Sequence, residues 1–210
     1  MERDFFYFLT LLPNEGQVLD LGANIGIMAY HLSKALPQAK IQAFEPVPQN
    51  LNVLKRIITH FKLENVIVRP YALGNESGSI EMVVPVVADV KMQGLSHVVH
   101  DTITEFNQGE TFQVPVKRLD EIPELQGQRT TGIKIDVENF EYFVLEGGRQ
   151  LIQKHQPIIY SELWENENRE KVFELLSQLN YSINIVQSNQ LVEFNQTKHH
   201  TQNFIFLPNS

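Results

Sequence analysis

The segment Val18–Gly26 constrains the fold of this chain more than any other. It reads Val-Leu-Asp-Leu-Gly-Ala-Asn-Ile-Gly, a short apolar strand that ends in an acid and turns through two glycines into a helix. A second apolar strand, 41–44, closes on another carboxylate, Glu45, nineteen positions after Gly26. A strand, a glycine turn, a helix and an acid-tipped strand are typical of a nucleotide-binding βαβ unit.

The charge of this turn indicates which nucleotide it binds. A dinucleotide places its pyrophosphate against the turn and the first amides of the helix, a site that disfavours a nearby carboxylate. Asp20 stands two positions before Gly22, and no Lys or Arg occurs between Val18 and Ser33. S-adenosylmethionine has no phosphate and carries a sulfonium and an ammonium, which favour carboxylates. We therefore expect S-adenosylmethionine, with an NAD-dependent oxidoreductase as a rival hypothesis.

Each residue of the turn has an expected role in holding this cofactor. Asp20 would meet the ammonium directly or through water, and Glu45 would accept hydrogen bonds from both ribose hydroxyls. Gly22 would allow a tight turn close to the ligand, and Gly26 would let the helix approach the sheet. The third strand of such a unit ends beside the adenine, so the turn at Tyr71 is either the adenine wall or an ordinary strand exit. The predicted cofactor-binding residues are Asp20, Gly22, Ala23, Asn24, Gly26, Glu45, Tyr71 and Ala72.

Composition excludes several other classes. With 210 residues the chain has room for one α/β domain, 1–210, but not for two large ones. A net charge of −8 without a cluster of Lys and Arg argues against nucleic acid as a partner. The absence of Cys excludes disulfides, thiolate metal sites and cysteine nucleophiles. It is also compatible with the cytoplasm, which is the location we expect.

The N-terminal segment 1–14 contains an aromatic run, Phe5–Leu12. The run is too short to span a bilayer and its flank lacks the basic character of a signal peptide, so we expect no transmembrane segment. The segment either packs on the domain as a helix or extended stretch, or forms part of a substrate lid or an oligomer contact. The second alternative leaves a homo-oligomer open.

Periodicity predicts the remaining elements. Strands are expected at 66–68, 77–85, 112–116, 132–138 and 157–162. Helical spacing is expected over 51–61, 140–152 and 172–179, and an antiparallel pair of strands at 181–186 and 203–207. Asn139 is expected to cap the second of these helices. Residues 86–110 show no clean periodicity, so we interpret them as a variable substrate-facing loop or lid.

Acids gather where the predicted strands end. Because ligands of open α/β sheets bind at the carboxyl ends of the strands, these acids should share one edge. Their mutual repulsion would be relieved by a cation, either S-adenosylmethionine or a divalent metal held by Asp136, Glu138 and Glu162. A hydroxyl acceptor would also need a base, for which Asp136, Glu138, His97 and His100 are candidates. Lys134, inside its strand, would pair with one of the acids or lie at the sheet's edge.

Taken together, these residues resemble the FkbM family of S-adenosylmethionine-dependent methyltransferases. The resemblance extends over about residues 15–207, and the family usually has a glycine where this chain has Asn139. The matching pieces are Asp20-Leu21-Gly22-Ala23-Asn24-Ile25-Gly26, Phe44-Glu45-Pro46, Ala72-Leu73-Gly74, Leu119-Asp120, Lys134-Ile135-Asp136-Val137-Glu138 and Phe204-Ile205-Phe206-Leu207.

The resemblance implies a Rossmann-like class I methyltransferase fold, a three-layer α/β/α arrangement with a seven-stranded, mostly parallel sheet. Six of its strands would be parallel and one antiparallel. It also implies methylation of a hydroxyl on a small-molecule or glycan acceptor such as a sugar, glycolipid or natural product. Asp136, Glu138 and His97 are the catalytic candidates, and no metal ligand is assigned. A noncatalytic S-adenosylmethionine-binding scaffold is a further hypothesis.

Overall fold

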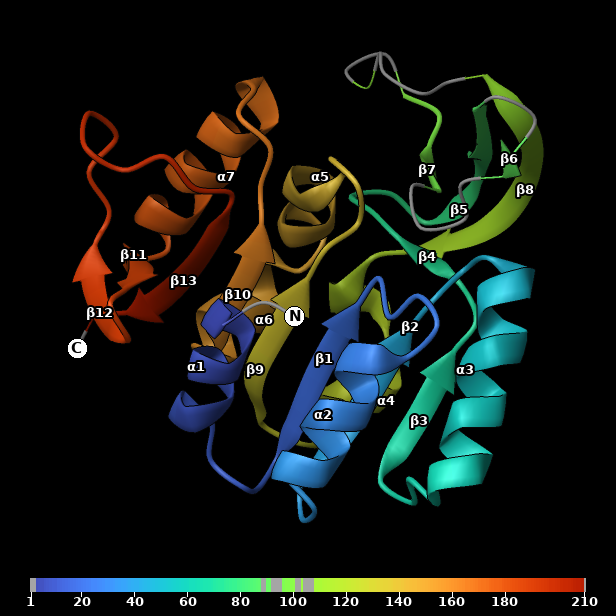
Figure 1. The fold of residues 1–210 in the computed structure, drawn as a ribbon, viewed down its shortest axis with the longest axis horizontal. Helices are drawn as coiled ribbons and strands as arrows, with labels where there is room; N and C mark the ends of the chain where they lie inside the picture. Colours follow the sequence, from blue (N-terminus) through green and yellow to red (C-terminus); the bar gives the residue numbers. More distant parts are fainter. Residues whose placement is uncertain (1–2, 88–89, 92–95, 101–102, 104–107, 210) are drawn as a thin grey trace.

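A computed structural model describes residues 3–87, 90–91, 96–100, 103 and 108–209 (Figure 1). A central sheet carries helices on both faces, and a smaller sheet stands beyond the carboxyl ends of β1, β2 and β3 (Figure 1). The strands of the central sheet are β1 (Gln17–Leu21), β2 (Lys40–Phe44), β3 (Val66–Arg69), β9 (Thr130–Ile135), β10 (Ile158–Glu162), β11 (Tyr181–Gln187), β12 (Gln190–Glu193) and β13 (Asn203–Pro208).

The central sheet has eight strands in the order β12-β11-β13-β10-β9-β1-β2-β3. From β3 to β10 every pairing is parallel, whereas β13 runs antiparallel to both of its neighbours. The predicted arrangement of six parallel strands and one antiparallel strand is therefore present, but the predicted total of seven is wrong. The eighth strand, β12, folds back on β11 through Ser188 and Asn189, both with positive φ (51° and 61°). A two-residue turn of this kind can close a hairpin on a strand too short for its periodicity to be recognised.

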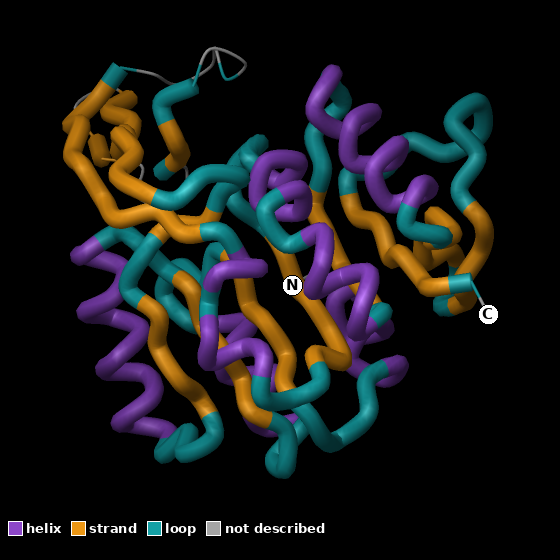
Figure 2. The backbone as a smooth tube through the Cα atoms, turned by 180° about the vertical axis from the view of Figure 1, so that it is seen from behind, coloured by secondary structure: helices purple, strands orange, loops and turns teal. Residues whose placement is uncertain are grey.

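Alternation along the strands decides which helices cover each face of the sheet. On β1, Leu19 and Leu21 belong to the cluster beneath α4 to α7, whereas Val18 belongs to the cluster beneath α1 and α2. Both faces are thus covered, as Figure 2 shows from behind. The helices are α1 (Arg3–Leu11), α2 (Ile27–Ala35), α3 (Pro48–Phe61), α4 (Pro123–Gln126), α5 (Glu141–Glu146), α6 (Arg149–His155) and α7 (Glu167–Gln178), with the 3₁₀ helix η2 (Leu119–Glu121).

The N-terminal aromatic segment packs on the domain as a helix. Phe5 and Phe8 are fully buried, and their ring centroids lie 5.9 and 5.7 Å from that of Tyr160 on β10. Phe6 points outward and is 37% exposed. Residues Arg3–Leu11 of this segment thus form a helix that packs on the domain. Within the described residues, no helix is both long and apolar enough to cross a membrane.

The predicted helix over 140–152 is two helices, α5 and α6, separated by Gly147 and Gly148. A Cβ at Gly147 would lie 2.0 Å from the carbonyl oxygen of Gly74, so this break lets two backbone segments touch. Asn139 is not the cap that was predicted, since Phe140 occupies that position and makes no side-chain cap. α6 is capped instead by Asp120, whose carboxylate accepts from two of its first amides.

The second sheet consists of β4 (Ala72–Leu73), β5 (Gly78–Val87), β6 (Val90–Lys91), β7 (His97–Val98) and β8 (Gly109–Lys117). The predicted strands at 77–85 and 112–116 correspond to β5 and β8, which pair antiparallel. The short strands β6 and β7, both paired with β5, lie within the predicted loop 86–110. Residues 88–89, 92–95, 101–102 and 104–107 of that loop lie outside the described residues.

The turn after β1 depends on Gly22. Its φ is 78°, and a Cβ there would lie 1.9 Å from the carbonyl oxygen of Asp136. We expect Gly22→Ala to lower the free energy of unfolding by more than about 2 kcal/mol, because backbone strain and a clash with main chain add together. Urea unfolding measures this loss. Gly127→Ala is the control, since its φ is −82° and no atom lies within 4 Å of the added methyl. Equal stability of the two variants would contradict the role given to Gly22.

Candidate functional site

A pocket opens where β1, β2 and β9 end, beneath the second sheet. It holds about 630 Å³ of space between protein atoms, including a part open to solvent, which is a size common for ligand sites. Met82 and Val98 of the second sheet and Ser96, just before β7, form part of its wall. The residues that line it are Gly22, Asn24, Phe44, Glu45, Pro46, Val47, Asn50, Tyr71, Ala72, Leu73, Met82, Ser96, Val98, Asp136, Val137, Glu138 and Phe140.

Glu45 lies at the tip of β2 and is only 4% exposed. Its Oε2 accepts from the amide of Asn24 (2.8 Å), and its Oε1 accepts from the amide of Val47 (2.9 Å) and from Nδ2 of Asn50 (3.3 Å). Burial raises the pKa of Glu45 above its ordinary value, although these three donors oppose the shift. The carboxylate is therefore held rigidly in the pocket wall by the turn after β1 and the first turn of α3.

Asn50 is a pocket residue that the sequence reasoning missed. It is 3% exposed and lies on the first turn of α3, five positions after Glu45. Its Nδ2 donates to Glu45, but its buried Oδ1 has no hydrogen-bond partner among the described residues. In the sequence nothing distinguishes it from an exposed helical asparagine.

A second hollow adjoins the pocket along the turn between β1 and α2. It is lined by Gly22, Ala23, Asn24, Ile25, Ile27, Met28, Asn50, Lys134 and Asp136. Four of these residues, Gly22, Asn24, Asn50 and Asp136, also line the first pocket. The two hollows therefore meet at the glycine turn, which an elongated ligand could follow.

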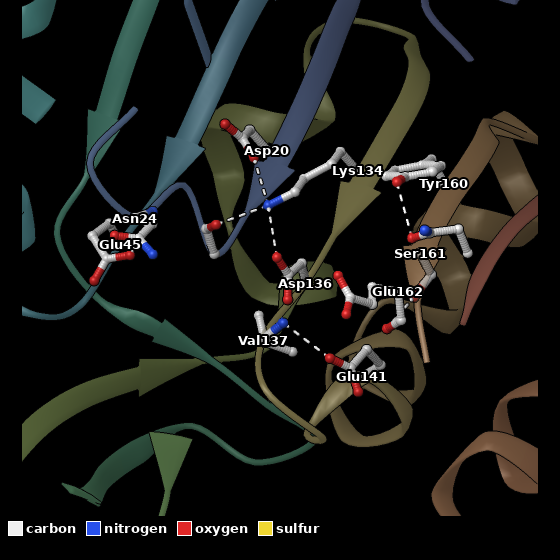
Figure 3. Close-up of polar contacts among 12 residues, drawn as sticks. Asp20, Asn24, Glu45, Lys134, Asp136, Val137, Glu141, Tyr160, Ser161 and Glu162 are labelled. Atoms are coloured by element: carbon white, nitrogen blue, oxygen red, sulfur yellow. Dashed lines mark hydrogen bonds and ion pairs between the residues drawn. The ribbon is translucent and has the colours of Figure 1, made fainter. Parts of the chain in front are cut away.

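Lys134 lies beneath this turn and joins its parts, as the dashed lines in Figure 3 show. Its Nζ donates to the carbonyl oxygen of Gly22 (2.9 Å) and lies 3.4 Å from Oδ1 of Asp20 and 3.8 Å from Oδ2 of Asp136. Burial opposes the charge of the ammonium, but the two carboxylates outweigh it, so the pKa of Lys134 is raised. Of the two alternatives for Lys134, the ion pair is thus the one observed.

Asp20 itself does not reach the pocket. Its side chain is fully buried on the face of β1 opposite Leu19 and Leu21, and it lines neither hollow. The charge that the sequence appeared to leave free in the turn is paired with Lys134, which comes from β9. The five acids expected at one edge are therefore divided: Glu45, Asp136 and Glu138 line the pocket, Asp20 is enclosed beneath it, and Glu162 lines neither hollow.

The loop after β9 brings Asp136, Val137 and Glu138 to the pocket. Glu138 has a left-handed backbone, with φ 52°. Burial raises the pKa of Glu138 to about 8, and the charges of Asp136, Glu141 and Glu162 add to the shift. Asp136, in contrast, has the ammonium of Lys134 beside it. The two acids of the loop thus differ in their electrostatic surroundings.

Glu141 is a second residue that the sequence reasoning missed. It is 2% exposed, and its Oε1 accepts from the amides of Val137 (2.9 Å) and Asn139 (3.3 Å), so it holds the loop from inside. On the other side, Oδ1 of Asn139 accepts from Nδ2 of Asn166 (2.6 Å), the residue that caps α7. Asn139 has φ 76°, a conformation that asparagine tolerates better than most residues. The loop is therefore fixed from both sides.

The remaining predicted residues fall at different distances from the pocket. Tyr71 and Ala72 line it, and the ring of Tyr71 lies under Nζ of Lys117 at 4.5 Å. Gly26 does not line it; a Cβ there would lie 2.5 Å from Cδ1 of Leu54, so this glycine lets α2 approach α3 and not the sheet. His97 is buried on β7 and is not among the lining residues, although its neighbours Ser96 and Val98 are.

The divalent metal considered for Asp136, Glu138 and Glu162 gains no geometric support. Across the described ranges, no group of three or more His, Asp or Glu side chains is arranged to hold a metal ion. Glu162 lies at the end of β10 near Glu138 and raises the pKa of that residue.

The Methyltransferase FkbM domain matches residues 20–200 of this sequence, most of the chain. The chain belongs to the FkbM methyltransferase family. The resemblance found in the motifs is thereby confirmed. Within this FkbM protein, the matched region contains every residue that lines the pocket and all parts of the turn, from Asp20 to the loop after β9.

Two curated relatives of this FkbM protein also carry the name methyltransferase. "Methyltransferase 1" of Beauveria bassiana (strain ARSEF 2860) is 28% identical over 158 residues, which cover 69% of this chain and 63% of the relative. "Methyltransferase sdnD" of Sordaria araneosa is 27% identical over 188 residues, which cover 77% of this chain and 71% of the relative. The chain therefore spans less than two thirds of the length of the Beauveria relative.

Solved structures show the same fold. The methyltransferase FkbM from Methylobacillus flagellatus KT has a TM-score of 0.64 at 17% identity, and the match covers 98% of this chain and 48% of that one. An rRNA methylase from Streptococcus thermophilus has a TM-score of 0.53 at 11% identity, with 98% and 95% covered. The class I methyltransferase fold expected from the motifs is thus observed, with an additional edge strand.

Removing the buried cation of this FkbM protein should be costly. We expect Lys134→Met to lower the free energy of unfolding by about 3–5 kcal/mol, because it leaves the carboxylate of Asp20 buried without a partner. Urea unfolding at pH 7 measures the loss. Lys171→Met removes an exposed ion pair with Glu167 (2.7 Å) and should change stability little. The added substitution Asp20→Asn should recover part of the loss in the Lys134 variant. A Lys134 variant as stable as the Lys171 variant would contradict the interpretation.

Proposed function

We propose that this chain is an S-adenosylmethionine-dependent O-methyltransferase that acts on a hydroxyl of a sugar, glycolipid or natural product. The observation that carries the proposal is the buried carboxylate of Glu45 in the pocket of an FkbM methyltransferase. A SAM-dependent O-methyltransferase from Thermotoga maritima shares the fold with a TM-score of 0.50 at 13% identity, covering 97% of this chain and 63% of that one.

The residues of the two hollows fit this cofactor. Glu45 and Asn50 offer buried acceptors for hydroxyl groups, and Tyr71, Ala72 and Leu73 offer an apolar wall for a flat ring. Gly22 lets the backbone approach a ligand closely. When bound, S-adenosylmethionine supplies a methyl group on a positively charged sulfur. In this proposal Gly22, Ala23, Asn24, Glu45, Tyr71 and Ala72 border the cofactor, whereas Asp20 and Gly26 act behind them as parts of the turn.

The electrostatic support for a cationic ligand comes from the loop after β9 and from Glu45. Because Asp20 is ion-paired with Lys134, its charge is largely neutralised inside the protein. Asp136 and Glu138 face the pocket, and the side chain of Asp136 is 39% exposed. Carboxylates in this position favour a sulfonium and disfavour a pyrophosphate. They support the choice of S-adenosylmethionine over a nicotinamide dinucleotide.

Within the proposal, Glu138 is the general base and Asp136 an electrostatic partner. A base must hold the proton of the acceptor hydroxyl, and a carboxylate with a pKa near 8 does so far better than one with an ordinary pKa. Asp136 lies 3.8 Å from Nζ of Lys134 and is ion-paired with it, so we assign it the electrostatic role. A carboxylate oxygen of Glu138 would therefore take the proton of the acceptor hydroxyl as that oxygen receives the methyl group.

The acceptor is proposed to enter beneath the second sheet. Met82 of β5, Val98 of β7 and Ser96 just before β7 form that side of the pocket, which suits a small molecule or the end of a glycan. The net charge of −8 supports the exclusion of nucleic acid. Methylation assays should therefore include RNA beside a panel of hydroxylated small molecules, and transfer to RNA alone would contradict the proposed acceptor class.

Cofactor identity can be tested without an acceptor. S-adenosylhomocysteine should raise the melting temperature of the protein, and NADH should not, because the pocket presents carboxylates where a pyrophosphate would lie. A thermal-shift assay with each ligand alone and with both together measures this. Stabilisation by NADH alone would contradict the proposal. Binding without transfer to any acceptor in a broad panel would instead favour the noncatalytic scaffold.

Replacing Glu45 should weaken cofactor binding strongly. We expect Glu45→Ala to lose about 2 kcal/mol or more of binding free energy for S-adenosylhomocysteine, since a charged acceptor is removed from the pocket. Isothermal titration calorimetry measures the loss. Glu174→Ala, which removes an exposed carboxylate on α7, is the control and should bind as the wild type does. Unchanged affinity in the Glu45 variant would remove this residue from the site.

The role of Glu138 predicts a dependence on pH. With an acceptor found in the panel, kcat should rise as the pH rises through about 8, because the base must be ionised, and Glu138→Gln should remove this rise. Protein labelled with ¹³C-glutamate should show one carboxyl titrating near pH 8 that Glu138→Gln abolishes. The folded state binds this proton more tightly than the unfolded state. The contribution of this proton to the free energy of unfolding is therefore complete below the ordinary pKa of glutamate and is lost as the pH rises through about 8. Burial also raises the pKa of Glu141, to about 7, so the assignment rests on the signal that Glu138→Gln removes. A carboxyl near pH 8 that persists in Glu138→Gln, or no such carboxyl in the wild type, would contradict it.

A further inference from the structure

The acceptor positions of Glu45 do not suffice for the two ribose hydroxyls assigned to it. An ionised carboxylate offers about four acceptor positions. Three are filled by the amides of Asn24 and Val47 and by Nδ2 of Asn50. In this geometry Glu45 therefore has room for about one more donor, whereas a ribose diol presents two.

The missing acceptor lies beside it. Asn50 lines both hollows, and its buried Oδ1 has no hydrogen-bond partner among the described residues. The orientation of the amide is fixed, because a carboxylate can only accept and Nδ2 must therefore face Glu45. Oδ1 is then left as an acceptor without a partner in a residue that borders both hollows. A buried acceptor without a partner is uncommon in folded proteins and asks for an explanation.

We infer that Asn50 shares with Glu45 the recognition of a vicinal diol, each residue accepting from one hydroxyl. The inference rests on the proposed function, in which that diol is the ribose of S-adenosylmethionine. Asn50 thereby determines specificity as well as affinity. A phosphate in place of either hydroxyl has no hydrogen to donate and brings negative charge against Glu45, so the site selects an unphosphorylated ribose.

The test is calorimetry with S-adenosylhomocysteine and its 2′-deoxy and 3′-deoxy analogues. The wild type should bind each analogue more weakly than the parent, because each lacks one donor. Asn50→Ala should bind the parent about 5- to 10-fold more weakly, the loss of one hydrogen bond. It should also be indifferent to one of the two deletions, since the partner of that hydroxyl is gone. Asn52→Ala, an exposed asparagine on the same helix, is the matched control and should behave as the wild type does.

The outcomes separate the two proposals. A wild type that binds no S-adenosylhomocysteine overturns the proposed function and the role of Asn50 with it. A wild type that binds, together with an Asn50→Ala variant of equal affinity, overturns the role of Asn50 alone. The same holds if the variant still penalises both deletions as the wild type does. Asn50→Leu, which is closer in volume, repeats the measurement if the alanine variant unfolds.

Discussion

The site depends on one buried ammonium group. Nζ of Lys134 neutralises Asp20 beneath the glycine turn, holds the carbonyl oxygen of Gly22 and lies beside Asp136 in the loop after β9. Two loops that approach so closely that only a glycine fits between them are thereby tied to one charge. In a low-dielectric interior such a cation is tolerated only with its counter-charges in place. Removing one of these groups would therefore destabilise the others.

This pair also changes the electrostatic argument that the sequence allowed. Along the chain Asp20 has no basic neighbour, and a free carboxylate in the turn would point to a cationic ligand. The cation arrives from a strand more than a hundred positions later, brought beside β1 by a parallel pairing that puts Asp20 opposite Lys134. The conclusion drawn from Asp20 therefore has to rest on other acids. Glu45, Asp136 and Glu138 take over that support because they face the pocket.

Patterns among neighbouring residues were sufficient to predict much of the fold. Features that depend on contacts between distant segments could not be predicted from the sequence. The turn at Gly22, the helix opened by Pro48 and the strands β5 and β8 follow from spacing and alternation, which are properties of neighbouring residues. The break at Gly147 follows from its contact with Gly74, a meeting of segments far apart in the chain. Asn50 and Glu141 were missed for a related reason. An asparagine or a glutamate in a helix resembles any surface residue until the fold shows that it is buried.

The loop after β9 explains how two neighbouring acids can differ in chemistry. Glu141 anchors its amides from below, and the bond between Asn139 and Asn166 ties it to α7, so a left-handed backbone is held where a free loop would relax. The rigid loop leaves Asp136 next to the ammonium of Lys134 and places Glu138 among other carboxylates. A flexible loop would not hold the two carboxylates in these different surroundings. The difference that the proposed chemistry needs is therefore produced by the residues that fix the backbone, none of which has to touch the substrate.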